Sequence, residues 1–180
     1  DLWAQMDLKS IKAATADLFE RWENHWLSID IDRCLNSRYN GHFPKISTFG
    51  SVATYICKMK NPVFEKLMAQ LRLGCKDKLS LYVDKRRYII DCTALCMSCN
   101  LLVLETLCHF ILLCPIYQPY RLHYLHRFVP ECSNSSTIPA ERVDSTILDQ
   151  LNCSYDLDKV AAICRYVPSA LRLRSFSLNE

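Results

Sequence analysis

Three cysteines and a histidine in the middle of the chain offer the side chains that a soft divalent metal prefers. Cys96 and Cys99 are separated by two residues, and His109 and Cys114 follow shortly after them. The two-residue gap lets both sulfurs meet one ion, and three thiolates with one imidazole fill the four positions of a tetrahedral zinc site. The spacing predicts one structural Zn²⁺ ion, because a catalytic zinc would keep one position open for water.

Other residues near this group leave its membership open. Cys92 and Cys108 lie close enough in the sequence to replace one of the four ligands. His123 and His126 form an i,i+3 pair that could also bind a metal, although such a pair is more typical of a helix surface or a packing contact.

The predicted ligands need a turn followed by a helix. After the cysteine pair comes Asn100, a residue type that tolerates the left-handed backbone conformation such a turn can require. The sequence from Glu105 to about Phe128 is typical of one helix, from which His109 and Cys114 would project. Because five positions do not match the α-helical repeat, we expect a bend at Cys114-Pro115.

A basic segment precedes the predicted metal site, although the net charge of the chain is only +3. Over residues 58–87, nine lysines and arginines face only three acidic residues, which suits a polyanionic partner such as RNA or DNA. The alternative is a solvated basic face. The candidates for phosphate contacts and for stacking on bases are, respectively, Lys76, Lys78, Lys85, Arg86 and Arg87, and Tyr82 and Tyr88.

Composition and hydrophobic spacing predict a mainly α fold: an irregular helical domain stapled by the one zinc site. Half of the residues are hydrophobic and only three are glycine. We expect an N-terminal helix and connecting loop over 1–46, a helical zinc-knuckle core over 47–128, a linker over 129–142 and C-terminal helices over 143–180. The expected helices span about 4–27, 51–59, 61–73, 105–128, 143–151 and 157–173, the last broken at Pro168.

Cysteine usage and the ends of the chain bear on its setting. The eleven cysteines are an odd number and several lie in apolar helical patterns, which favours a reducing, intracellular compartment over a disulfide framework. The longest apolar run, Leu101 to Ile116, is shorter than the roughly 20 residues of a membrane span, so no membrane partner is expected. Without an initiator methionine or a leader, the chain is interpreted as a fragment.

No catalytic constellation is found in the sequence. Tyr82-Val83-Asp84-Lys85 is superficially like the metal-binding turn of polymerases, but a lysine takes the place of the second carboxylate that two-metal chemistry needs. Glycine-rich phosphate loops, nucleophile elbows and His-Glu-x-x-His helices are also missing. We therefore expect a non-catalytic module.

The motifs together resemble the C-terminal region of non-LTR (LINE-type) retrotransposon reverse transcriptases. The matching residues are Leu71-Arg72-Leu73-Gly74, Cys96-x-x-Cys99, Glu105-Thr106-x-x-His109, Cys114-Pro115, Tyr117 and Arg121, with Trp22 and Trp26 upstream. The resemblance implies a zinc-knuckle tail of an RNA-directed DNA polymerase polyprotein, located in the nucleus. Such a tail would help the upstream polymerase engage RNA or target DNA in target-primed reverse transcription.

One departure from that family and one amphipathic helix favour a different role. Leu101-Leu102-Val103-Leu104 is apolar where the family commonly has polar residues and glycine, which predicts a buried scaffold instead of an exposed reading loop. Phe19, Trp22 and Trp26 recur on one face of the first expected helix. The alternative function is therefore a structural or protein-interaction module that packs on the polymerase core or on a host protein, without direct nucleic-acid binding.

Overall fold

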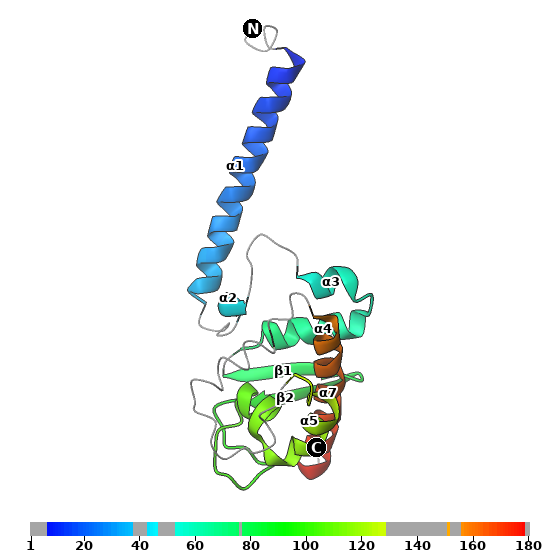
Figure 1. Ribbon diagram of the computed structural model, residues 1–180. Coiled ribbons are helices and arrows are strands. Elements are labelled where there is room, and N and C mark those ends of the chain that lie inside the picture. Colours follow the sequence, from blue (N-terminus) through cyan, green and yellow to red (C-terminus); the bar gives the residue numbers. More distant parts are fainter. Residues whose placement is uncertain are drawn as a thin grey trace. The chain divides into compact units, whose positions relative to one another are not determined.

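The computed structural model describes residues 7–37, 43–46, 53–75, 77–128, 151 and 156–178. The chain divides into two compact units, Asp1–Ser37 and Arg38–Glu180. Helices dominate the described residues, and the one sheet found there has two strands (Figure 1). The mainly α prediction is confirmed at the level of fold class, whereas a zinc staple remains a prediction.

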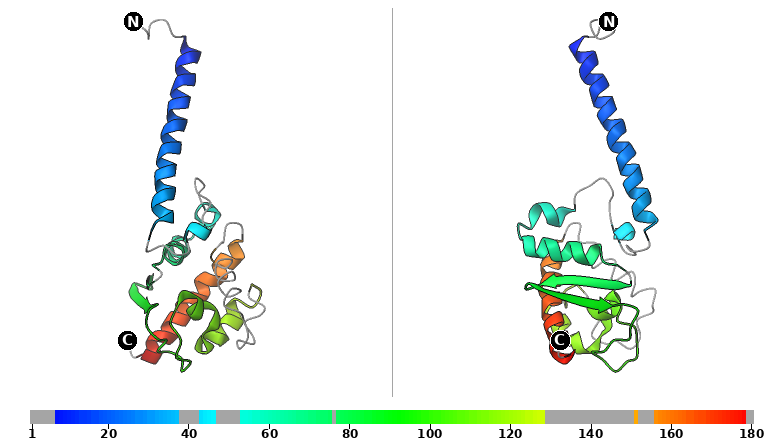
Figure 2. Two further views of the ribbon diagram at one scale, coloured as in Figure 1. Left: turned by 90° about the vertical axis from the view of Figure 1, so that its left-hand side faces the viewer. Right: turned by 180° about the vertical axis from the view of Figure 1, so that it is seen from behind.

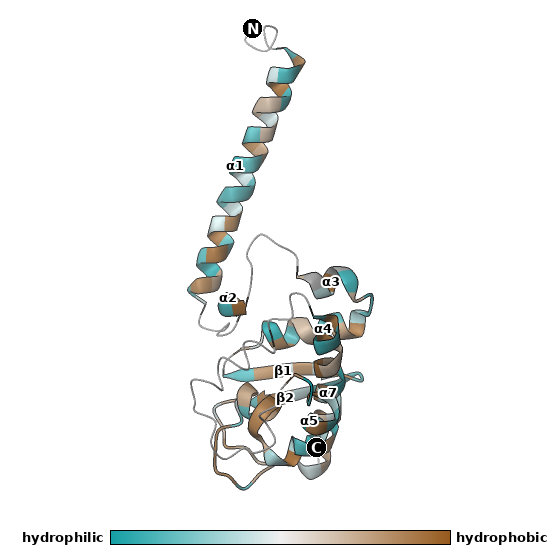
Figure 3. Ribbon diagram, in the orientation of Figure 1, coloured by the Kyte–Doolittle hydropathy of each residue, from teal (hydrophilic) through white to brown (hydrophobic). Residues whose placement is uncertain are grey.

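The first unit is a single long helix, α1 (Leu8–Leu35). It begins later than the predicted 4–27 because the Asp7 carboxylate caps it, accepting a hydrogen bond from the Ser10 N–H at 2.7 Å, and it also ends later, at Leu35. The rings of Trp22 and Trp26 meet edge to face, with centroids 6.4 Å apart. Figure 3 shows polar and apolar residues alternating along the helix, so its hydrophobic stripe is weaker than the sequence pattern suggested.

The second unit starts with three short helices. They are α2 (Phe43–Ile46), α3 (Thr54–Lys58) and α4 (Pro62–Arg72). As predicted, Asn61 caps α4, accepting hydrogen bonds from the N–H groups of Val63 and Phe64, and proline follows at the first helical position. Gly74 follows the end of α4, and a Cβ atom there would lie 2.5 Å from Leu79 Cδ1. A larger residue at this position would therefore require the buried Leu79 side chain of the next strand to shift.

The basic segment forms a β-hairpin, which its sequence pattern did not predict. Strands β1 (Lys78–Val83) and β2 (Arg86–Asp91) pair antiparallel, with Val83 opposite Arg86. Asp84 and Lys85 form the two-residue turn with φ of 50° and 64°, the signature of a type I′ turn. The turn has neither the Asn-Gly nor the Asp-Gly pair that usually signals a hairpin in a sequence. The hairpin is stabilised by burial of alternate apolar side chains: Leu79, Leu81, Val83, Tyr88 and Ile90.

The predicted helix over residues 105–128 is wrong as a continuous element. The chain forms instead a π-helical turn η2 (His109–Leu113), a 3₁₀ turn η3 (Pro115–Tyr117) and α5 (Gln118–Tyr124). The break falls at the predicted place. Pro115 excludes the helical conformation from the preceding residue, and Cys114 is extended, with ψ of 121°.

The last helix, α7 (Leu157–Leu178), packs against α3, α4 and α5 (Figure 2). The predicted break at Pro168 is wrong, since α7 continues through that residue. Buried Val167, Ala170 and Leu171 surround it, and their packing outweighs the roughly 3 kcal/mol that an interior proline costs.

Some predictions fall outside the described residues. These are the linker over 129–142 and the helix over 143–151, apart from its last residue. That residue, Leu151, is helical and buried. Among the helices that the structure does describe, none combines the length and apolar character needed to cross a bilayer. The cysteines that the structure describes are free thiols and form no disulfide.

Candidate metal centre

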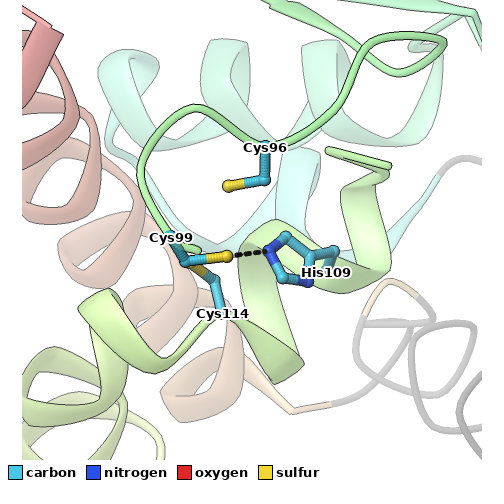
Figure 4. A group of neighbouring side chains, drawn as sticks. All are labelled: Cys96, Cys99, His109 and Cys114. Atoms are coloured by element: carbon cyan, nitrogen blue, oxygen red, sulfur yellow. Dashed lines mark hydrogen bonds between the residues drawn. The ribbon is translucent and has the colours of Figure 1, made fainter. Parts of the chain in front are cut away.

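The four predicted ligands lie together in the interior of the second unit (Figure 4). The Sγ atoms of Cys96, Cys99 and Cys114 and a ring nitrogen of His109 are all within 4.8 Å of one another. Cys99 Sγ and His109 Nε2 are 3.4 Å apart. With Zn–S bonds of about 2.3 Å, tetrahedral ligands are separated by about 3.8 Å, so a small contraction would close this group around one ion. The donor set fits a zinc-type metal.

A short pairing of backbone segments shapes the cysteine knuckle. The Cys96 N–H donates to the Val103 carbonyl at 2.8 Å, and the Glu105 N–H donates to the Ala94 carbonyl at 2.9 Å. These bonds bring the start and the end of the knuckle loop side by side. Leu102, with φ of 54°, has the left-handed conformation that the sequence analysis considered for Asn100.

The π-helical turn brings the other two predicted ligands, His109 and Cys114, to the same side of the chain. In an α-helix, positions five apart differ by about 140° in direction, so His109 and Cys114 would point to different sides. Here the Cys114 N–H donates to the His109 carbonyl at 2.7 Å, an i→i+5 bond that puts the extra residue into one turn. Thr106 supports the start of this turn, because its Oγ1 accepts from the His109 N–H at 3.1 Å.

Burial sets the protonation of the cluster. The four side chains belong to residues that are at most 8% exposed. Burial raises the pKa of Cys96, and it raises the pKa of Cys114 to about 12, because a buried thiolate without a metal is poorly solvated. Burial also lowers the pKa of His109, which favours the neutral imidazole that binds metals. A bound cation would displace the thiol protons.

Two groups beside the cluster hold the loops that carry its ligands. The Tyr117 hydroxyl donates to Ser98 Oγ at 3.0 Å, inside the cysteine knuckle. Glu105 is 3% exposed and forms a two-pronged ion pair with Arg174 of α7. Sequence spacing gave no signal for the Glu105–Arg174 contact, since the partners are 69 positions apart.

The other candidate ligands lie elsewhere. Among the residues that the structure describes, the metal-type group consists of the four predicted residues, and neither Cys92 nor Cys108 belongs to it. Cys92 is buried, and its thiol points to the Ile90 carbonyl at 3.9 Å. His123 and His126 line a surface pocket between α5 and α7. The alternatives left open by the sequence are therefore not supported by the geometry.

The hairpin places most of the predicted nucleic-acid residues on the surface and one of them in the core. Lys78 and Tyr82 are exposed on β1, Arg86 and Arg87 are exposed at the start of β2, and Lys85 is exposed in the turn. Tyr88 is only 6% exposed, so its ring belongs to the core and cannot stack on a base. Lys76 lies outside the described residues.

Tyr82 is the centre of the exposed hairpin face. Tyr82 is 48% exposed and lies opposite Arg87 in the strand register. The Arg87 guanidinium lies 5.9 Å from the ring centroid and the Lys66 Nζ of α4 lies 5.5 Å from it. Lys66 belongs to the basic segment but was not among the predicted contacts, because only the packing of α4 on β1 brings it here.

The apolar knuckle loop is exposed, contrary to the prediction of a buried scaffold. Leu101 is 57% exposed and Leu102 is 78% exposed. An antiparallel bridge between Leu95 and Leu104 closes the loop. Cys96 and Cys99 are buried inside it, whereas its apolar side chains face outward. Other exposed apolar residues of the loop are Leu95, Met97, Val103 and Leu104.

Comparison with protein-family models, with curated proteins and with solved structures finds no match to this chain.

Proposed function

We propose that this chain is a zinc-stapled, nucleic-acid-binding accessory module without a catalytic role of its own. In this proposal Cys96, Cys99, His109 and Cys114 hold one structural zinc ion, and the basic hairpin contacts RNA or DNA. The buried Cys₃His group supports the first part, because such a donor set completes a tetrahedron and leaves no position for a substrate.

The observation that carries nucleic-acid binding is the exposed ring of Tyr82 between the cations of Lys66 and Arg87. An aromatic ring can stack on any base, and neighbouring cations can pair with the adjacent phosphates. This combination suits a strand bound without sequence preference. The ring and its cations come from α4, β1 and β2, which are packed into one surface.

The positions of the acidic residues favour the tip of the hairpin as the place of phosphate contact. Asp84 is occupied by an ion pair with Arg172 of α7, and Asp91 lies opposite Lys78 in the register. The positive charges of Lys85, Arg86 and Arg87 have no comparable acidic partner on the hairpin strands. The turn and the start of β2 therefore carry most of the positive charge available to phosphate.

The first test measures zinc content and nucleic-acid binding of the purified chain. We expect one zinc per chain and binding of single- and double-stranded RNA and DNA that weakens steeply with salt. Changing Lys85, Arg86 and Arg87 together to Gln should lower the slope of log Kd against log salt by up to about 2 on single strands, at about 0.7 per lost phosphate contact.

The matched control removes arginines from another surface. Arg127→Gln with Arg165→Gln changes two exposed residues that line the pocket between α5 and α7. This variant should keep most of the affinity and of the salt slope if the hairpin is the site. Losses in proportion to the charges removed, two in the control and three in the hairpin variant, would indicate attraction by net charge alone. No binding by the zinc-loaded protein would refute the proposal.

We also propose that the parent protein is a non-LTR reverse transcriptase, with this chain as its C-terminal tail. The motif residues support this because they have local structural roles here: Glu105 forms the buried ion pair, Thr106 caps the ligand turn, and Gly74 allows β1 to approach α4. The test is to join the chain to an upstream polymerase domain of that class. Target-primed synthesis should fall in the triple Gln variant while synthesis on a simple primer-template is retained.

The exposed knuckle loop favours a second candidate function, a protein-interaction module. Leu101 and Leu102 offer apolar surface that a partner such as the polymerase domain could bury. Leu101→Ser with Leu102→Ser should abolish docking to that domain in a pull-down and leave zinc content and nucleic-acid affinity unchanged. Docking that survives this change would exclude the loop as the interaction surface.

A further inference from the structure

Arg121 of α5 is a buried cation whose hydrogen bonds are incomplete. The residue is 3% exposed, and its Nε and Nη1 atoms have no hydrogen-bond partner among the described residues. Leaving charged N–H groups buried and unpaired is strongly unfavourable, so an arginine in this state is stabilised by a compensating negative charge.

The surroundings of Arg121 connect it to the ligand cluster. It belongs to α5, which packs against both α7 and η2, the turn that begins at the ligand His109. From α7, the Tyr166 hydroxyl donates at 2.8 Å to the carbonyl of Phe110, the residue after His109. Four positions before Arg121 on the same side, Tyr117 donates to Ser98 of the cysteine knuckle. The positive charge of Arg121 also contributes to the lowered pKa of His109, after the larger effect of burial.

The protein side chains nearby do not supply the missing negative charge. Glu105 is the only buried carboxylate among the described residues, and both of its oxygens are engaged by Arg174. The thiols of the cluster are neutral when protonated. A zinc ion with three thiolates and one neutral imidazole has a net charge of −1, since two positive charges are set against three negative ones.

We propose that Arg121 is the countercation of the zinc–thiolate centre and tunes its affinity for metal. This inference rests on the zinc site of the proposed function and adds a residue that does not touch the ion. The buried guanidinium stabilises the negative centre formed when the metal replaces the thiol protons. Without metal, the same guanidinium is an uncompensated charge that destabilises the fold.

This arrangement predicts opposite effects in the two states of the protein. Arg121→Met removes the charge and keeps most of the side-chain volume. Zinc affinity, measured by competition with a chromophoric chelator, should fall by about 10–100-fold, as for other residues that support metal ligands. In excess chelator, the urea midpoint of Arg121→Met should be equal to or higher than that of the original protein. Arg121→Lys keeps the charge and should lose much less zinc affinity than Arg121→Met.

The outcomes separate this inference from the proposed function. If the unchanged protein binds no zinc, the proposed metal site fails. If it binds zinc but the Met and Lys variants bind equally well, or Met lowers stability equally with and without metal, the countercation role is refuted. If Arg121→Met does not fold even with zinc, Arg121→Gln takes its place as the neutral variant. If the metal-free protein is unfolded, the difference in zinc affinity between the neutral variant and Arg121→Lys decides whether Arg121 is the countercation.

Discussion

Glu105 and Arg174 join the start of the ligand turn to the last helix through a buried ion pair. The two bonds, Nε to Oε1 and Nη2 to Oε2, are 2.9 Å and 3.0 Å long. Both residues are at most 5% exposed. The pair fixes the direction from which the chain leaves the cysteine knuckle, and α7 thereby supports a candidate metal centre to which it contributes none of the four predicted ligands.

Removing one partner of this pair should be strongly destabilising. Glu105→Gln leaves the Arg174 charge buried without compensation, and we expect unfolding free energy to fall by about 3–5 kcal/mol in urea titrations of the zinc-loaded protein. Glu105→Leu with Arg174→Met should recover much of that loss. The exposed pair of Arg172 and Asp84 is the control: Arg172→Gln should cost at most about 1 kcal/mol.

Changes to the ligands should remove zinc and structure together. Cys99→Ser and His109→Ala each leave an incomplete tetrahedron, and the binding energy of such sites is largely folding energy. We expect loss of stoichiometric zinc by elemental analysis and loss of cooperative thermal unfolding by circular dichroism. Cys75→Ser, outside the cluster, should retain one zinc per chain, as should Cys92→Ala. Full zinc content in Cys99→Ser would contradict the assignment.

The two hairpin tyrosines should respond differently to mutation. Tyr82→Ala removes the exposed ring and should weaken binding of single-stranded RNA or DNA by about 1–3 kcal/mol in fluorescence anisotropy, with little change in stability. Tyr82→Phe keeps the stacking surface and should bind normally. Tyr88→Ala should instead lower stability by about 3–5 kcal/mol because its ring is part of the core. Unchanged affinity in Tyr82→Ala would exclude stacking at this residue.

The hairpin turn is not optimal for stability. Lys85 has φ of 64°, a conformation that costs a side-chain-bearing residue roughly 1 kcal/mol and glycine almost nothing. Lys85→Gly creates the Asp-Gly pair that type I′ turns favour, so it should raise the melting temperature while it weakens nucleic-acid binding by one phosphate contact. A lower melting temperature would contradict the observed turn. Ser80→Gly, within β1, should be destabilising.

Local spacing determined much of the candidate site in advance. Cys96 and Cys99 are so close in sequence that one turn brings their sulfurs together, and His109 and Cys114 lie on the element that follows. The start of α4 was predictable for the same reason, because Asn61 caps the helix through N–H groups two and three residues away. Such features depend on contacts over a few positions, which a sequence displays directly.

The tertiary structure decided the features that depend on distant partners. Burial against the core converts the basic segment into a hairpin, which hides Tyr88 and exposes Tyr82 between cations from two elements. The ion pair of Glu105 and the continuity of α7 through Pro168 likewise require packing across the chain. Local preferences of about 1 kcal/mol are overruled by burial and ion pairing of several kcal/mol, and only the folded chain shows where that happens.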